Sequence, residues 1–356
     1  MIKNYLSELH IKDGKRMPTF SAVFGTSTND LKTMKKLIIS ALVIISGFGS
    51  CQQKDPATST VKSHDGNVDQ KMLDIFKQVK TYTDNPWYEI EFSQDACGYE
   101  ILVNDVPVHR YFLAGSVNEQ RIQINDHILR AGKQEITIRL FPPVLSDGSV
   151  SQTLVDASTF KIKVIRRKAG GSLEDYKQVF EFKTSHKTGT ENFLASGQKA
   201  FEFKGIFNAE VPYQLEGWTH SKDLSKENQD DLLKEAVKAY NNFRDVLIRK
   251  DLNTYASMMY DKEVELARAF YWNSSADSKE RWKEMSGTVL EKRDILPLKD
   301  FKMVLYAGGK VLALQPTSEM YKDYLSAIHA QTSDEDIQVS FLLHKKAGSN
   351  ELTPIR

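Results

Sequence analysis

The chain has 356 residues, of which 40% are hydrophobic and 27% charged. At about 100–200 residues per domain, this length predicts two or three domains, and the composition excludes a disordered chain and a multispan membrane protein. The formal net charge of +1 gives no strong field for nucleic acid, and the only two cysteines, Cys51 and Cys97, exclude a disulfide scaffold and a four-cysteine metal site.

A targeting segment begins at Met34, where the chain has the sequence MKKLIISALVIISGFGSCQQKD. A basic start, a short apolar run and small residues before a cleavage point are typical of a secretory signal. The run is shorter than the roughly 20 residues that span a bilayer. We therefore predict a signal peptide over residues 34–50. Residues 1–33 precede it and contain no apolar run, so we interpret them as a mis-called start or a removed extension, outside the fold argument.

The residues around the predicted cleavage point carry a resemblance. Phe48-Gly49-Ser50-Cys51 resembles the lipobox of bacterial lipoproteins, and Gln52-Gln53-Lys54-Asp55 resembles in part the export signal of Bacteroidetes-type lipoproteins. The resemblance implies that Cys51 is lipidated and anchors the mature chain in the outer membrane, facing the periplasm or the cell surface. An uncleaved N-terminal anchor is the alternative. Residues 1–51 hold seven Lys/Arg and three Asp/Glu, so the mature charge is +1 − 4 = −3.

The mature chain begins with a polar stretch and then shows β periodicity. Residues 51–68 are polar and predict a flexible tether, and a short amphipathic helix is expected near 72–79. From 87 to 207, apolar residues alternate with polar ones, which predicts antiparallel strands with one buried and one wet face. We assign 69–218 to an all-β antiparallel sandwich with a β extension.

Two details of this β region are predicted separately. The extension follows a turn at Gly170-Gly171, and one larger sandwich is the alternative. Cys97 stands just ahead of a strand pattern, so we expect a buried core residue there, with a reactive thiol as the alternative.

The pattern changes over 219–356. Apolar spacings of three and four predict helices near 225–249 and 277–290, and Asp251 is expected to cap a helix between them. Period two then returns, with a hairpin around Gly308-Gly309. A short helix over 321–329 and strands over 337–343 and 352–355 complete the prediction.

Helices followed by an antiparallel sheet indicate an α+β domain, so the fold class is multidomain: an all-β sandwich and then α+β. The element order over 225–356 is similar to that of the cone-shaped NTF2-like fold. That resemblance implies a cone enclosing a pocket. A cone filled by Tyr240, Phe243, Tyr255 and Met259 would remove the basis for such a pocket.

The sequence contains no nucleophile elbow, phosphate-binding loop, dinucleotide fingerprint, H-E-x-x-H or C-x-x-C motif. No two histidines of the mature chain lie three or four residues apart, and we expect neither a metal nor a cofactor. If the cone is catalytic, the first residues to test are Glu263, Glu265, Tyr240 and His329. A solvated helix face is the favoured alternative for the glutamates.

Trp218 and His220 follow Gly217 at the junction of the two regions and are candidates for a ligand-binding lip. Packing of the two regions by Trp218 is the favoured alternative.

The predicted function is a lipid-anchored binding or interaction protein of the cell envelope, in a toxin-neutralising or envelope-scaffolding role. Its partners would be the membrane, through the lipid on Cys51, and an envelope protein or glycan, with no nucleic acid. The alternative is an enzyme or small-ligand binder that uses a pocket in the C-terminal domain, and enzymatic activity is the less favoured of the two.

Overall fold

The computed structural model describes residues 10–12, 15–17, 66–145, 147–319, 321–331 and 336–356. The predicted signal at 34–50, Cys51 and most of the tether lie outside these residues. The described chain is mostly β, with antiparallel pairing throughout, as predicted. Among its helices, none is both long and apolar enough to cross a membrane. Strands β1 (His10–Lys12) and β2 (Lys15–Met17), in the part set aside above, pair with each other.

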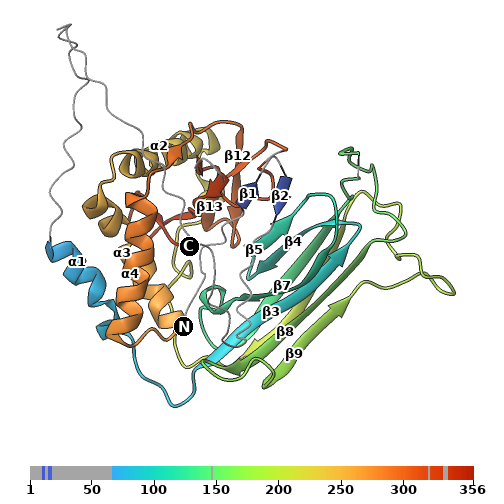
Figure 1. Ribbon diagram of the computed structural model, residues 1–356, viewed down its shortest axis with the longest axis horizontal. Helices are drawn as coiled ribbons and strands as arrows, with labels where there is room; N and C mark the ends of the chain where they lie inside the picture. Colours follow the sequence, from blue (N-terminus) through green and yellow to red (C-terminus); the bar gives the residue numbers. More distant parts are fainter. Residues whose placement is uncertain (1–9, 13–14, 18–65, 146, 320, 332–335) are drawn as a thin grey trace, which may run out of the picture.

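Two four-stranded sheets pack face to face (Figure 1). One has the order β6-β3-β8-β9, with bounds β3 Pro86–Asp95, β6 Val117–Gln123, β8 Thr159–Lys168 and β9 Tyr176–Lys183. The other has the order β10-β7-β4-β5, with bounds β4 Gly98–Val103, β5 Val106–Tyr111, β7 Gly132–Phe141 and β10 Phe201–Ala209.

Aromatic rings from both sheets meet in the shared core. The ring centroids of Phe92 and Tyr99 lie 5.5 Å apart, and those of Tyr99 and Phe160 lie 5.1 Å apart. Cys97 is buried beside them, and burial raises the pKa of its thiol to about 12. A thiol with so high a pKa stays protonated at neutral pH, and the expected core role of Cys97 is confirmed.

The strands after Gly170-Gly171 complete the two sheets instead of extending beyond them. Strand β9 pairs with β8 and strand β10 pairs with β7, so the alternative of one larger sandwich is the correct one. The Phe182 ring on β9 and the Phe203 ring on β10 stack between the two sheets, with their centroids 4.0 Å apart. A Cβ at Gly205 would lie 2.4 Å from the Phe180 ring, so the close approach of β9 and β10 requires glycine there.

The helices confirm most of the C-terminal prediction. Their bounds are α1 Gly66–Leu73, α2 Gln229–Ile248, α3 Leu252–Ala269 and α4 Ser275–Leu290. Asp251 caps α3 by accepting a hydrogen bond from the Thr254 amide, as predicted. Helix α1 and the following 3-10 helix, Ile75–Gln78, pack against α3 and α4, so these residues lie with the helices and not, as predicted, with the sandwich.

The C-terminal strands form two further sheets. The larger has the order β12-β13-β16-β17, with bounds β12 Phe301–Tyr306, β13 Val311–Pro316, β16 Leu343–Lys345 and β17 Leu352–Pro354. The smaller has the order β11-β14-β15, with bounds β11 Asp294–Ile295, β14 His329–Gln331 and β15 Asp336–Gln338. The predicted hairpin at Gly308-Gly309 is confirmed.

Two local predictions in this region are wrong. The described residues of 321–329 form turns before β14, not a helix, because the Tyr321 and Tyr324 rings pack on His329 with centroids 4.2 and 5.1 Å away. Tertiary contacts override the propensity of so short a segment. The predicted strand over 337–343 is divided, since β15 ends at Gln338 and β16 begins at Leu343.

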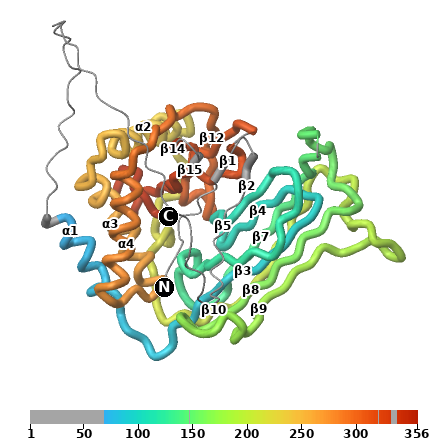
Figure 2. Tube along the Cα trace, viewed as in Figure 1, coloured from blue at the N-terminus to red at the C-terminus, as the bar shows by residue number. Residues whose placement is uncertain are grey.

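The larger C-terminal sheet lies between the helices and the sandwich (Figure 2). Alternate residues of β13 divide between two cores: Leu312 and Leu314 belong to the core that contains the helices, and Val311 and Ala313 belong to a second, smaller core. A strand that is buried on both faces has consecutive apolar residues instead of alternating ones. This explains the apolar run at the start of β13, whose sequence is VLALQP.

Candidate functional site

The two glutamates predicted as catalytic candidates serve separate structural contacts. Glu263 is buried and accepts two hydrogen bonds from Arg281, at 2.7 and 2.8 Å. Glu265 accepts from the Gly217 amide at 2.8 Å and pairs with Arg356 at 3.0 Å. Residues two apart on a helix face different directions, so the two glutamates form no common acid–base site. Glu263 is buried, so the favoured alternative of a solvated helix face does not hold for it.

Tyr240 and His329 lie in the packed interior of the C-terminal part. The Tyr240 hydroxyl donates to the Phe341 carbonyl at 2.6 Å and accepts from the Leu314 amide at 2.9 Å. Burial raises the pKa of Tyr240 above its ordinary value, so it remains a neutral phenol. His329 Nε2 lies 3.2 Å from the Ser326 carbonyl oxygen. Tyr240 and His329 both contact Ser326, but neither contacts the two glutamates through a described bond.

The space expected for a catalytic cone is occupied by side chains. Tyr240, Phe243, Tyr255 and Met259 are all buried between the helices and the sheet. The Phe243 ring stacks on Phe341 at 4.2 Å. The Tyr240 side chain therefore belongs to a filled interior, which removes the structural basis stated above for a pocket there.

Trp218 packs the two regions together, as the favoured alternative expects. Its ring is buried, and the Arg356 guanidinium lies 5.6 Å from the ring centroid. It belongs to a small core shared by the sandwich and the C-terminal sheet: Leu102, Val106, Trp218, Tyr306, Val311, Ala313, Leu342 and Ile355. His220 is exposed on the surface, and the cavity described next is lined by other residues.

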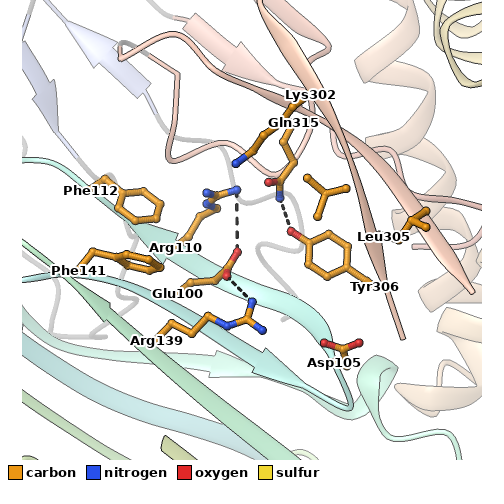
Figure 3. A pocket seen from close by; sticks show the side chains of 11 residues that line it. Glu100, Asp105, Arg110, Phe112, Arg139, Phe141, Lys302, Leu305, Tyr306 and Gln315 are labelled. Carbon is orange, nitrogen blue, oxygen red and sulfur yellow. Dashed lines mark hydrogen bonds and ion pairs between the residues drawn. The ribbon is translucent and has the colours of Figure 1, made fainter. Parts of the chain in front are cut away.

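A cavity of about 390 Å³ lies where the outer face of the β4-β5-β7 sheet meets strands β12 and β13 (Figure 3). Pockets for small ligands begin at about this size. The lining is mixed, with five charged side chains, two polar groups and four apolar ones: Glu100, Asp105, Arg110, Arg139, Lys302, Tyr306, Gln315, Phe112, Phe141, Val304 and Leu305.

A ladder of alternating charges crosses the sandwich side of the cavity. Glu100 on β4 pairs in register with Arg110 on β5 and with Arg139 on β7, and Arg139 pairs with Glu202 on β10. Arg139 is held firmly, because its Nη1 lies 3.1 Å from Glu100 and its Nε lies 2.8 Å from Glu202. Opposite charges in directly facing positions stabilise the sheet.

Arg110 is the exception in this ladder. Its nearest carboxylate contact, from Nη1 to Glu100 Oε1, is 4.0 Å long, which exceeds hydrogen-bond distance. Within the part of the chain that the structure describes, its buried Nε and Nη1 atoms have no hydrogen-bond partner, and the residue is 9% exposed. The guanidinium stacks 4.9 Å above the Phe112 ring centroid. A buried donor without an acceptor is costly and marks a place where a further acceptor is expected.

The C-terminal side of the cavity supplies a second cation and a neutral donor. Lys302 and Gln315 face each other on β12 and β13, and Lys302 points toward Arg110 in Figure 3. The Gln315 amide donates to the Tyr306 hydroxyl. Burial and then Glu100 raise the pKa of Tyr306 above its ordinary value, so the hydroxyl keeps its proton. That proton can be donated to an acceptor in the cavity.

Two hairpins hold the walls of the cavity in place. Asn104 and Asp105 both have positive φ, at 52° and 59°, which fits the two-residue turn between β4 and β5. The Asp105 carbonyl accepts from the Ala307 amide at 3.0 Å, and its carboxylate accepts from the Gly308 amide at 3.0 Å. The β4–β5 turn is therefore hydrogen-bonded directly to the β12–β13 turn. Asp105 and Tyr306, next to these bonds, line the cavity.

No motif in the sequence points to this site. Glu100 and Arg139 occupy polar positions of the alternating pattern, which predicts a wet face, whereas the C-terminal sheet covers that face. The apolar run of β13 and the outward-facing Leu102 were the available signals, because they indicate a covered sheet.

Comparisons of this chain with protein-family models, with curated proteins and with solved structures gave no match.

Proposed function

We propose that this chain is a lipid-anchored protein of the cell envelope that binds a small ligand in the cavity between the sandwich and the C-terminal sheet. The observation that carries the binding role is Arg110 at the wall of a cavity of about 390 Å³: two donors of this buried guanidinium have no partner among the residues that the structure describes. The anchor rests on the resemblance of the segment ending at Cys51 to a lipoprotein signal. The order of three helices and then an antiparallel sheet supports, as part of the same proposal, an NTF2-like C-terminal fold.

The position of the cavity favours binding over the alternative of an enzyme in the cone. The residues expected to act in the cone each serve a structural contact. By contrast, Arg110 on β5 converges on one space with Lys302 and Tyr306 on β12. A site between two packed layers with a few convergent polar groups is typical of ligand binding. A protein or glycan partner in the envelope remains a prediction beside this one.

The test compares the wild-type chain with a cavity-filling variant. The full chain is extracted from membranes in mild detergent and examined by native mass spectrometry for a bound small molecule. Val304 lines the cavity, so Val304→Trp should release that mass. Val150→Trp is the matched control, because Val150 is 52% exposed and does not line the cavity.

Two results would contradict the proposed function. One is retention of the same small molecule by Val304→Trp. The other is an empty wild-type chain whose melting temperature no member of a diverse small-molecule set raises, since a bound ligand stabilises the folded state in proportion to RT ln(1 + [L]/Kd).

A further inference from the structure

We infer that the ligand of this cavity is a small organic monocarboxylate with an aromatic or apolar body, held by Arg110 and Lys302. This inference rests on the proposed function, because it names the chemical class that the same cavity would take.

The unbonded donors of Arg110 define the first requirement on the ligand. A buried guanidinium keeps its charge at every physiological pH, and its donors need acceptors. Among the described residues, Glu100 is the nearest anion to Arg110, and it already accepts a hydrogen bond from Arg139 at 3.1 Å. A ligand carboxylate would supply the missing acceptor, through charge-assisted bonds that are stronger than neutral ones.

The charge balance of the cavity defines the second requirement. Its lining holds three cations, Arg110, Arg139 and Lys302, against the carboxylates of Glu100 and Asp105. Asp105 is engaged by the Gly308 amide, and Arg139 is bound by Glu100 and by Glu202 outside the lining. Arg110 and Lys302 are left facing each other (Figure 3). Arg110 is buried and Lys302 is exposed at the edge of the cavity, and one negative group between the two cations would be attracted to both.

The remaining walls favour a carboxylate on an apolar body over a phosphate. Phe112 and Phe141 pack with ring centroids 5.2 Å apart beside Arg110, and Val304 and Leu305 line the other side. The nearby Glu100 would repel a dianion more than a monoanion. The Tyr306 hydroxyl adds a neutral donor, which suits the second oxygen of a carboxylate.

The experiment titrates the full chain in detergent with matched probes, followed by NMR. Phenylacetate is the carboxylate probe, phenylacetamide its neutral counterpart, and inorganic phosphate the alternative anion. Phenylacetate should bind saturably, and the other two should bind at least tenfold more weakly. Arg110→Gln should weaken phenylacetate binding by roughly 10- to 100-fold, the range expected for lost hydrogen bonds to a charged group.

Arg121→Gln is the matched control, since it also removes one arginine that pairs with a glutamate, Glu91, on the opposite sheet. It should leave binding unchanged, and urea unfolding of both variants checks that they fold. Arg110→Lys keeps the charge but loses the planar fork, so it should bind with intermediate affinity.

The carboxylate inference is overturned if phenylacetate does not bind, if phenylacetamide or phosphate binds as tightly, or if Arg110→Gln folds and binds like the wild type. If a neutral molecule binds and Val304→Trp displaces it, the proposed function stands and only this inference fails. If Val304→Trp displaces no ligand of any class, the proposed function fails as well.

Discussion

The Glu263 carboxylate and the Arg281 guanidinium form a two-point ion pair between helices α3 and α4. Arg281 Nε donates to Oε2 at 2.7 Å and Nη2 donates to Oε1 at 2.8 Å, with the Glu263 side chain 2% exposed. Burial alone would raise the pKa of Glu263, but the charge and hydrogen bonds of Arg281 outweigh it and hold the pKa below its ordinary value.

Glu263→Gln should lower the free energy of unfolding by about 3–5 kcal/mol, because it leaves the Arg281 charge buried without a counter-ion. Urea unfolding at pH 7 measures this. The loss should shrink as the pH falls through the depressed pKa of Glu263, since the wild-type carboxylate is then protonated and its contribution is lost as well. Glu280→Gln on the exposed face of α4 is the control. Equal stability of the two variants would contradict the structural role of Glu263.

His344 should make stability fall on acidification. Its Nδ1 lies 2.7 Å from Ser221 Oγ, and burial, followed by the charge of Lys346, lowers its pKa to about 4. Between its ordinary value of 6.5 and about 4, the unfolded chain binds a proton that the folded chain does not, so the folded state loses about 1.4 kcal/mol per pH unit.

The variant His344→Asn removes this proton linkage. Its free energy of unfolding should fall by about 2 kcal/mol less than that of the wild type between pH 6.5 and pH 5, as measured by urea unfolding. His220→Asn, which makes the same change at an exposed position, is the matched control. Parallel curves for His344→Asn and the wild type would show that His344 titrates normally in the folded chain.

Tyr240→Phe tests the structural role of the most buried predicted site residue. The change leaves the Phe341 carbonyl and the Leu314 amide without their side-chain partner, which should cost about 1–3 kcal/mol of stability. Ligand affinity should not change, because Tyr240 does not line the cavity. Tyr255→Phe is the control, since Tyr255 is a second buried tyrosine of the same interior and does not line the cavity. A stable Tyr240→Phe with weakened ligand binding would restore the catalytic or binding assignment.

Cys51→Ala tests the lipid anchor. The variant should lose both palmitate labelling and membrane retention, because the proposed lipid would be attached to Cys51. Cys97→Ala is the control, since that thiol is buried and has a raised pKa, and its loss should leave labelling intact. Membrane retention of Cys51→Ala without label would instead indicate the uncleaved anchor.

Local sequence patterns predicted most of the elements, because the forces that define them act between near neighbours. Spacings of three and four predicted α2, and the Asp251 side chain capped α3 as expected. Period two predicted the strands of the sandwich. The predicted helix over 321–329 is wrong because so short a segment has little helical stability of its own. The segment instead packs its Tyr321 ring against His329.

The sequence by itself determined most of the helices and strands, and the apolar face of most strands of the sandwich. Only the tertiary structure decided what covers each face. The partners of Glu263 and Glu265 are 18 and 91 residues away, and the Asp105 turn meets Gly308 across 203 residues. Periodicity carries no information at that range. From the sequence alone, Arg110 is expected to be a solvent-exposed strand residue. Only the packing of the C-terminal sheet over the sandwich buries its guanidinium, and two of its donors then have no partner among the described residues.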